Sequence, residues 1–328
     1  MKKPEEKIDA EYPSPPSGGK AGEAIDDISE DFRPLEDMSV AFKPLYVERD
    51  RLKAALSPPR DVFVSQPDPF RFNQGVPLLT IDHLVDLTDS WEQAAGPLIR
   101  AMAAGFTSIK GDLKKFDEAL KDDRLHRRDW VDALLQGREV LLESAASSLG
   151  IEPRTFKFVL GQLLKPCLEK RVKTFKPLVE NLRWTMGYCP LCGALPELGL
   201  IKGDHDGERL LLCALCGHQW SFPGTACPYC GGEDHEEKEF YTIEGRGHQW
   251  AELCYGCKRY LVCIDLTGRP EVPAFETASA GIVHLDVLAQ QRGFLPVAVC
   301  PWNVVVREDI AREARLEPET EVKRVLLH

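Results

Sequence analysis

Four Cys-x-x-Cys pairs constrain this sequence more than any other feature. Of the eleven cysteines in the 328 residues, nine lie between Cys189 and Cys263, and eight of those nine belong to the pairs. The pairs are Cys189/Cys192, Cys213/Cys216, Cys227/Cys230 and Cys254/Cys257. Two sulfur atoms at this spacing can bind one metal ion while the amides between them point toward the sulfurs. The pattern therefore predicts that all eight cysteines are metal ligands.

The spacing of the pairs arranges them into two successive sites. Twenty residues separate the first pair from the second and twenty-three separate the third from the fourth, whereas only ten separate the second from the third. The motif Cys-Pro-x-Cys-Gly also occurs twice, at 189–193 and 227–231. The first spacing fits a four-cysteine zinc ribbon, and the second exceeds the usual gap by a few residues. We expect one ion on Cys189, Cys192, Cys213 and Cys216 and another on Cys227, Cys230, Cys254 and Cys257.

The residue after each pair affects how tightly the backbone can turn. A glycine there permits the turn of a metal knuckle, by which we mean a Cys-x-x-Cys pair with the residue that follows it. Gly193, Gly217 and Gly231 follow the first three pairs, but Lys258 follows the fourth. We therefore expect the fourth knuckle to be the least regular. Four thiolates suit zinc as well as a single iron, so both metals stay open.

The sequence contains no pattern of an enzyme active site. We find no nucleotide-binding loop, no serine or cysteine triad pattern and no convincing pair of carboxylates. A thioredoxin-like redox role for the pairs is disfavoured, because that motif belongs near a βαβ pattern that is absent here. Four protein ligands on each ion would leave no open coordination position for hydrolysis. We expect no catalytic residues, and metal sites that are structural or transfer electrons.

Charge narrows the classes of partner. The chain has 41 basic and 52 acidic residues, a net charge of −11 and a pI near 5.3. This balance argues against nucleic acid and against an anionic membrane surface. The N-terminus has no apolar signal region, and no run approaches the ~18 apolar residues of a spanning helix. We expect a cytoplasmic protein without membrane insertion, and in that reducing compartment paired cysteines indicate metal ligands before disulfides.

Composition and periodicity divide the chain into five segments and predict the α+β class. Residues 1–40 carry five basic and eleven acidic residues, which predicts an acidic disordered leader. Helical periodicity dominates afterwards and ends at Trp184, where glycines, cysteines and short alternating strands begin. The further segments are an α-helical domain at 41–185, a first metal module at 186–222, a second at 223–270, and a C-terminal helix and tail at 271–328.

The clearest helical stripe contains a cysteine and is followed by a basic run. The stripe consists of Phe156, Val159, Leu160, Leu163, Leu164, Cys167 and Leu168, so Cys167 is expected in the core. Pro166 is expected to kink this helix or break it near Leu163. Lys170, Arg171, Lys173, Lys176 and Arg183 form the basic run, for which a solvated helix face is favoured over a docking surface for an acidic partner.

Several single residues carry weaker expectations. Cys263 alternates inward in a predicted strand and belongs in the core, whereas Cys300 is expected to be exposed. Trp220 and Tyr260, each just after a knuckle, are expected to shield metal from water. His205 and His235 lie in charged loops and are expected to be solvated.

Taken together, these residues resemble the formate dehydrogenase accessory protein family, FdhE. The resemblance is carried by Tyr-Cys-Pro-Leu-Cys-Gly at 188–193, by Arg-Leu-Leu-Leu-Cys-Ala-Leu-Cys at 209–216 with Trp220, and by the order of the later cysteines. Individual motifs carry the resemblance over about 185–302, whereas before that only the helical architecture is similar. It implies helices followed by two rubredoxin-like modules, with iron or zinc bound by the eight paired cysteines.

The resemblance also implies a function. A member of this family is expected to be a non-enzymatic assembly factor in the cytoplasm, which binds the molybdenum- or tungsten-containing catalytic subunit of a respiratory formate dehydrogenase and enables its activity. One alternative is a rubredoxin-like iron protein that transfers electrons. Another is a nucleic-acid-binding zinc ribbon, which the acidic balance disfavours. The sequence leaves the oligomeric state open.

Overall fold

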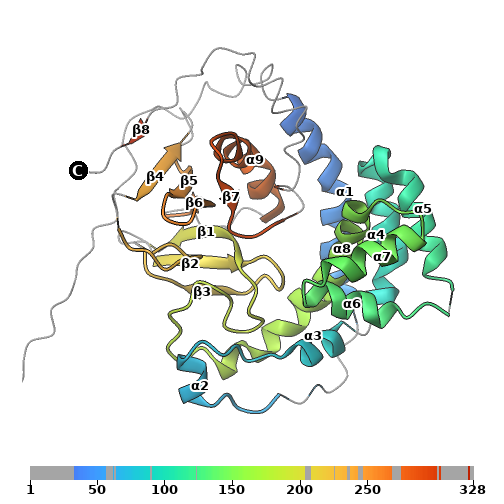
Figure 1. Ribbon diagram of the computed structural model, residues 1–328, viewed down its shortest axis with the longest axis horizontal. Coiled ribbons are helices and arrows are strands. Elements are labelled where there is room, and N and C mark those ends of the chain that lie inside the picture. Colours follow the sequence, from blue (N-terminus) through green and yellow to red (C-terminus); the bar gives the residue numbers. More distant parts are fainter. Residues whose placement is uncertain are drawn as a thin grey trace, which may run out of the picture.

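The chain forms a helical half followed by a sheet, so the predicted α+β class is confirmed. In this computed structural model the described residues are 33–56, 62, 64–88, 91–122, 124–203, 208–224, 226–234, 237–242, 247–267, 275–300, 303 and 324–325. For 33–40, 275–282 and 324–325 only the backbone is described. Helices lie on one side of the molecule and strands on the other, with the last helix against the strands (Figure 1).

The helical half is organised around one long buried helix. Its helices are α1 (Arg33–Ala55), α2 (Pro69–Asn73), α3 (Ile81–Leu87), α4 (Trp91–Gly105), α5 (Lys110–Ala119), α6 (Arg127–Leu135), α7 (Glu139–Ser148) and α8 (Pro153–Val172), with short 3-10 turns at Thr107–Ile109 and Lys173–Leu178. Every helix of this group except α2 makes contacts with α8 or with its neighbour α4. The predicted stripe on α8 is buried throughout, Cys167 included, which confirms that cysteine as a core residue.

Local sequence explains where several helices begin. The side chain of Asp68 accepts a hydrogen bond from the backbone N–H of Phe70 at the start of α2. Thr80 and His83 form a reciprocal capping box at the start of α3. Glu152 caps α8, whose first residue is a proline that has no N–H to leave unsatisfied.

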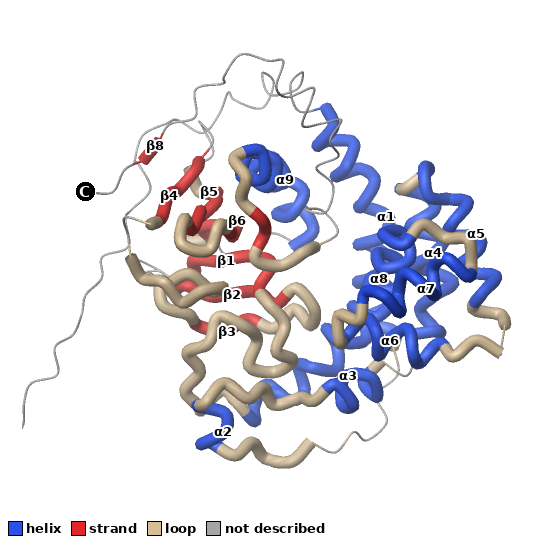
Figure 2. The backbone as a smooth tube through the Cα atoms, viewed as in Figure 1, coloured by secondary structure: helices blue, strands red, loops and turns tan. Residues whose placement is uncertain are grey.

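The strands form a single sheet that contains both predicted metal modules. They are β1 (Pro196–Lys202), β2 (Glu208–Cys213), β3 (Gln219–Ser221), β4 (Lys238–Thr242), β5 (Gln249–Cys254), β6 (Arg259–Asp265), β7 (Leu295–Pro296) and β8 (Arg324–Val325). Their order is β3-β2-β1-β6-β5-β4-β8, with β7 beside β6. Within each module the pairing is antiparallel, but β1 and β6 pair in parallel. These two neighbouring strands join the modules (Figure 2).

The last helix attaches to both halves. Helix α9 (Phe275–Gln291) makes contacts with α1 as well as with β5 and β6. The hydroxyl of Tyr260 donates a 2.8 Å hydrogen bond to the buried carboxyl of Asp286, and the side-chain amide of Gln290 donates to the same hydroxyl at 2.9 Å. Burial raises the pKa of Asp286 to about 7. These polar contacts fix how α9 lies on the sheet.

Two expectations about α8 and its surroundings are met only in part. Of the two outcomes expected at Pro166, a kink or a break, the break near Leu163 is excluded, because the helix continues through Pro166 to Val172. The basic run is not wholly solvated either. Arg171 is buried, and its guanidinium donates a hydrogen bond to the backbone carbonyl of Leu87.

Some expectations fall on parts of the chain that the structure does not describe. His205 and His235 lie outside the described residues, as do residues 1–32 of the expected leader and nearly all of the expected tail beyond Asn303. Helix α1 begins at Arg33, inside the segment expected to be the leader. Among the described helices, none is both long and apolar enough to cross a bilayer.

The seam between the two modules leaves no room for a side chain at Gly199. Gly199 pairs with Cys263 across β1 and β6, and a Cβ atom on it would lie 2.5 Å from the sulfur of Cys263. We predict that Gly199→Ala lowers the free energy of unfolding by ~1–3 kcal/mol, because the strands must separate to accept the methyl group. Urea denaturation measures this change.

The control is Gly161→Ala in α8, where no atom outside the helix backbone lies within 4 Å of the added Cβ. It should leave stability unchanged or raise it by ~0.5–1 kcal/mol, because alanine favours the helix. Equal stability of the two variants would show that the seam is not tightly packed.

Candidate metal centres

The structure brings the eight paired cysteines together in the two groups that the spacing predicts. Within each group the sulfur atoms all lie within 4.8 Å of one another. The first quartet is Cys189, Cys192, Cys213 and Cys216, and the second quartet is Cys227, Cys230, Cys254 and Cys257. In each quartet, one pair lies in a loop before an antiparallel hairpin of strands, and the other begins at the last residue of β2 or β5.

Distances between the sulfur atoms fit a bound ion and exclude disulfides. They are 3.7 Å for Cys189–Cys216 and 3.4 Å for Cys192–Cys213 in the first quartet, and 3.8 Å for Cys227–Cys257 and 3.7 Å for Cys230–Cys254 in the second. Four sulfurs at about 2.3 Å from one zinc ion stand about 3.8 Å apart in a tetrahedron. A disulfide would require about 2.05 Å. The donor sets present therefore fit a tetrahedral zinc or iron ion.

The knuckle backbones point amides toward the sulfurs. The N–H groups of Leu215 and Cys216 both donate to the sulfur of Cys213 at 3.4 Å. Such bonds stabilise the thiolate that a metal ion needs. Burial raises the pKa of Cys227 to about 11, so metal binding there must release a proton.

The residue after each of the four pairs has a positive φ. Gly193, Gly217 and Gly231 have φ angles of 77°, 66° and 73°. Lys258 has a φ of 56° and is therefore left-handed without being glycine. The fourth knuckle thus reaches the left-handed region against the steric preference of its residue, which is the departure that its sequence predicts.

The first quartet is enclosed by the helical half. Cys189, Cys213 and Cys216 are buried, and Cys192 is half-buried. The N–H groups of Leu78 and Leu79 each donate a 2.9 Å hydrogen bond to carbonyls of the first knuckle, those of Pro190 and Leu191. The hydroxyl of Tyr188, just before that knuckle, donates to the carbonyl of Gly75 at 2.7 Å. Residues 75–79 thus cover the first quartet.

The second quartet is open to the surface. Cys227 and Cys254 are buried and Cys257 is half-buried, but Cys230 is exposed. This difference follows from position in the sheet, since no segment of the helical half reaches the second pair of knuckles by a described backbone hydrogen bond. Two sites of equal local chemistry therefore have different access to solvent.

The two aromatic residues and two further cysteines singled out in the sequence are all buried. Trp220 is buried in the same apolar cluster as Cys189 and Cys213, and its indole N–H donates to the carbonyl of Met186 at 3.2 Å. Tyr260 packs in the cluster between the sheet and α9. Cys263 is fully buried, which confirms the expected core position. Cys300, expected to be exposed, is instead buried at 2% exposure, because its thiol points at Glu197 inside the protein.

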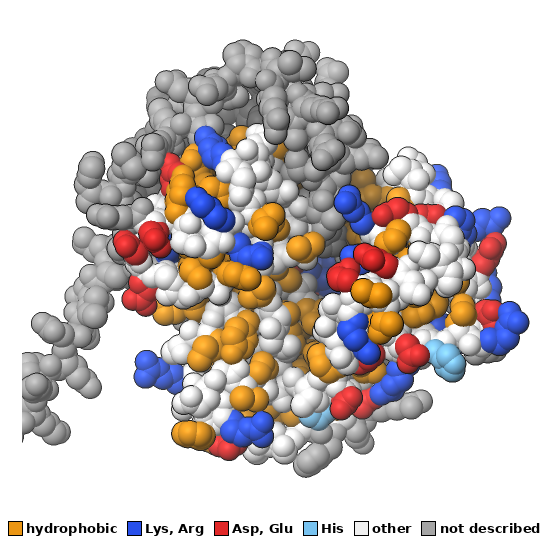
Figure 3. Space-filling view, in the orientation of Figure 1, with side chains coloured by type: hydrophobic (Ala, Val, Ile, Leu, Met, Phe, Trp, Pro, Cys, Tyr) orange, Lys and Arg blue, Asp and Glu red, His pale blue; other side chains and the backbone are white. Residues whose placement is uncertain are grey.

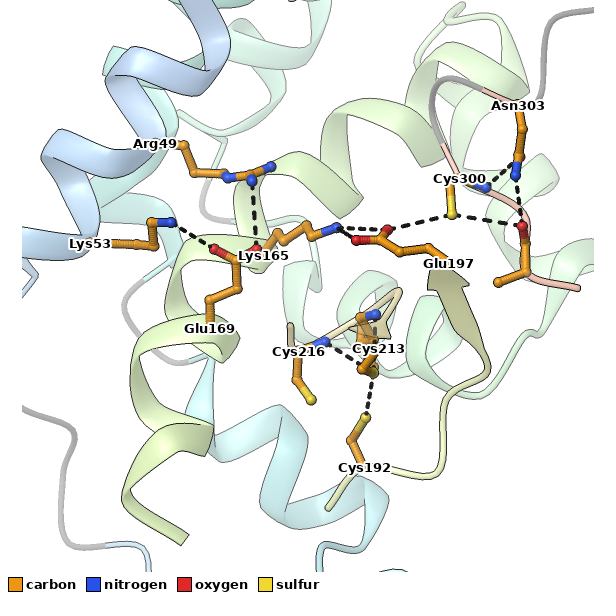
Figure 4. Close-up of polar contacts among 12 residues, drawn as sticks. Arg49, Lys53, Lys165, Glu169, Cys192, Glu197, Cys213, Cys216, Cys300 and Asn303 are labelled. Carbon is orange, nitrogen blue, oxygen red and sulfur yellow. Dashed lines mark hydrogen bonds and ion pairs between the residues drawn. The ribbon is translucent and has the colours of Figure 1, made fainter. Parts of the chain in front are cut away.

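A chain of buried charges, which sequence reasoning missed, lies beside the first quartet (Figure 4). The ammonium of Lys165 on α8 lies 3.1 Å from the carboxylate of Glu197 on β1, and both side chains are almost fully buried. The thiol of Cys300 donates to the same carboxylate at 3.5 Å. Further along α8, Glu169 pairs with Arg49 at 3.6 Å and with Lys53 at 3.1 Å, both on α1.

This charged chain connects α1, α8, β1 and the segment after β7. Burial raises the pKa of Glu197 to about 7, against the lowering effect of Lys165. The only signal in the sequence was a lysine inside an apolar stripe and a glutamate in an otherwise apolar strand, and neither residue indicates its partner.

Several known proteins to which this chain is similar belong to one family. Residues 188–223, which hold the first quartet, match the family described as FdhE, central domain. The protein FdhE homolog of Aquifex aeolicus is 30% identical over 167 residues, which cover 50% of this chain and 58% of that protein. The protein FdhE homolog of Pseudomonas aeruginosa is 28% identical over 237 residues, which cover 67% of this chain and 69% of that protein. The chain thus spans little more than half of the Aquifex relative.

A solved structure is also similar. The crystal structure of the FdhE protein from Pseudomonas aeruginosa matches 80% of this chain and 94% of that chain, with 22% identity and a TM-score of 0.49.

Single substitutions that remove one sulfur from one quartet at a time should distinguish the contributions of the two sites to metal content and stability. We predict that Cys213→Ser and Cys230→Ser each reduce the bound metal from two equivalents to one, measured by elemental analysis of the purified protein. Cys213→Ser should lower the unfolding temperature strongly, because the first quartet lies inside the protein against residues 75–79. Cys230→Ser should lower it less, because that sulfur is exposed.

Cys300→Ala is the matched control for these variants. It removes a buried sulfur that belongs to neither quartet and should leave two equivalents of metal. Unchanged metal content in Cys213→Ser or Cys230→Ser would refute ligation by the altered sulfur.

The buried pair of Lys165 and Glu197 gives a pH-dependent prediction. Lys165→Met leaves the carboxylate buried without its counter-charge and should cost ~3–5 kcal/mol of unfolding free energy above neutral pH. The raised pKa of Glu197 means that the folded protein holds this proton up to about pH 7, whereas the unfolded chain loses it near pH 4.5. The loss should therefore be smaller at low pH, where the carboxyl is neutral, and grow as the pH rises through 7.

Urea denaturation at two pH values tests this, with Lys165→Met/Glu197→Gln as the control. The double variant carries no titratable group at either position, so its own unfolding free energy should lack the pH dependence that Glu197 contributes. If Lys165→Met loses the same unfolding free energy at low and high pH, the charge of Glu197 is not what Lys165 stabilises, and the ion pair is contradicted.

Proposed function

We propose that this chain, which is similar to FdhE proteins over its matched region and to curated FdhE homologs, is a formate dehydrogenase accessory protein that binds the catalytic subunit of the enzyme in the cytoplasm and enables its maturation or activity. It acts as a binding protein and not as an enzyme. The client is the molybdenum- or tungsten-containing catalytic subunit of a respiratory formate dehydrogenase.

The observation that carries the proposal is the pair of closed sulfur quartets within the family's matched region and just after it. Cys189, Cys192, Cys213 and Cys216 would hold one iron or zinc ion, and Cys227, Cys230, Cys254 and Cys257 would hold the other. Four protein ligands fill a tetrahedral ion, so neither site offers a position for a substrate. When bound, the ions cross-link the knuckles and make the sheet a rigid support for a partner.

The remaining architecture supports a scaffold role. The parallel pairing of β1 with β6 holds both metal sites in one sheet, and the buried charges of Lys165 and Glu197 tie this sheet to α8. A partner would therefore meet two halves held in a fixed relation.

One observation favours a second function. Cys230 is exposed, so an iron ion on the second quartet would lie near the surface, as transfer of an electron to a partner requires. A rubredoxin-like role predicts a reversible change in visible absorption and loss of activity when zinc replaces iron. The assembly role predicts that the zinc form still binds its client.

The proposal is tested by capture of the client. The tagged 328-residue chain, expressed anaerobically with formate dehydrogenase, should retain the catalytic subunit on an affinity resin, detected by mass spectrometry and by formate oxidation. Cys213→Ser, which disrupts the enclosed metal site, should retain much less, and a tagged unrelated protein should retain none. Absence of the subunit from the wild-type eluate would refute the proposal.

A further inference from the structure

Lys258 is a lysine in a conformation that favours glycine. The three other knuckles place glycine at this position, and Lys258 alone bears a side chain there with a φ of 56°. A left-handed backbone costs free energy for any residue with a Cβ, so glycine would relieve strain at this point. Strain at one of four otherwise equivalent positions indicates that the side chain has a use.

The lysine side chain is held at the surface over aromatic rings. Its ammonium lies 4.4 Å from the ring centre of Tyr255 and 5.3 Å from that of Phe294. These are cation–π contacts, which orient the charge while it stays accessible to solvent. The ring of Tyr255 is fixed in turn, because its hydroxyl donates a 2.6 Å hydrogen bond to Glu239.

Two arginines nearby are oriented in the same manner. The guanidinium of Arg259 lies 4.0 Å from the ring centre of Tyr229, and that of Arg292 lies 4.0 Å from the ring centre of Tyr241. Within the described residues, Lys258, Arg259 and Arg292 form no ion pair with a carboxylate. Their charges are therefore available to another molecule.

Exposed apolar side chains lie next to these three cations. Tyr229 is 46% exposed, Tyr255 40% and Leu295 60%. Leu295 pairs with Arg259 across β7 and β6, and its N–H donates to the carbonyl of Lys258 at 3.0 Å, which places the apolar side chain beside the cations. Basic and hydrophobic side chains lie close together over the strands on the face that Figure 3 shows.

We propose that this knuckle face, which comprises Tyr229, Tyr255, Lys258, Arg259, Arg292 and Leu295, is a docking surface for an acidic, extended segment of a protein partner. Carboxylates of the segment would pair with the three cations, and an apolar residue would pack between the tyrosines and Leu295. Exposed tyrosine and arginine are typical of residues that dominate binding energies.

Charge complementarity identifies this occupant. The net charge of −11 opposes the approach of an acidic partner, whereas Lys258, Arg259 and Arg292, which form no ion pair among the described residues, attract it locally. The inference rests on the proposed function, since the acidic segment would belong to the formate dehydrogenase catalytic subunit.

Charge reversal on the knuckle face is the first test. Lys258→Glu/Arg292→Glu should reduce capture of the catalytic subunit at least tenfold and leave two metal equivalents bound. The matched control is Lys114→Glu on α5 combined with Lys121→Glu in the turn after that helix, where both lysines are exposed, and it should capture like the wild type. Equal capture by the two double variants overturns the inference, while wild-type capture still supports the proposed function.

Lys258→Gly provides a test that misfolding cannot imitate. Glycine relieves the left-handed strain, so the unfolding temperature should stay the same or rise, whereas capture of the subunit should fall. Wild-type capture by a variant of equal or higher stability would show that the lysine side chain is not used for binding.

A short fluorescent peptide of glutamate and leucine tests the surface without the client. It should bind the wild-type chain with an affinity that falls as salt rises, and bind Lys258→Glu/Arg292→Glu at least tenfold more weakly. A peptide with glutamine in place of glutamate should not bind. Equal binding of both peptides to the wild type overturns the inference even if the catalytic subunit is captured.

Other occupants of the same surface would be revealed by cross-linking from the knuckle face in the 328-residue chain. Cross-links to the acidic residues of 1–32 of the same chain, or to a second copy of the chain, would overturn the assignment to a partner. Cross-links to a carboxylate-rich segment of the catalytic subunit would support it.

Discussion

Two quartets of cysteine sulfurs, each gathered within 4.8 Å, are the constraint on which the rest of the structure depends. Four thiolates so close together repel one another unless a cation lies between them, so a bound ion would convert the arrangement from unfavourable to strongly favourable. At the first quartet the same ion would also hold together segments that are distant in sequence. Residues 75–79 hydrogen-bond to the knuckle at 189–193. The sulfurs of that knuckle in turn lie against those of Cys213 and Cys216, at the end of β2.

The two quartets show how equal local chemistry acquires different roles. Both have the same spacing of sulfurs and the same knuckle backbone, with left-handed residues after the second cysteine of each pair. The helical half encloses the first quartet, so that site belongs to the interior of the protein. The second quartet lies at the open part of the sheet, where Cys230 and the tyrosines of its knuckles are exposed. We interpret the first as a joint between the halves and the second as the support of a surface that a partner can reach.

Charge is used in two opposite ways in this acidic chain. Lys165 and Glu197 are removed from water and neutralise each other, which makes their pairing specific for one arrangement of α8 and β1. Lys258, Arg259 and Arg292 stay near water and are held over aromatic rings without a carboxylate partner among the described residues. The buried pair holds the molecule together, and the exposed cations provide a local attraction that the net charge would otherwise prevent.

The sequence by itself determined the α+β class, the grouping of the eight cysteines and the core positions of Cys167 and Cys263, because these depend on spacing and periodicity along the chain. It could not show that β1 and β6 join both modules in one sheet, since that pairing connects residues about sixty positions apart. Nor could it show that Pro166 is accommodated within α8, that Cys300 is buried against Glu197, or that Lys258 adopts the conformation of a glycine. The thiol of Cys300 meets Glu197 of β1, and the ammonium of Lys258 lies over Phe294, so both contacts join residues far apart in sequence that no local pattern connects.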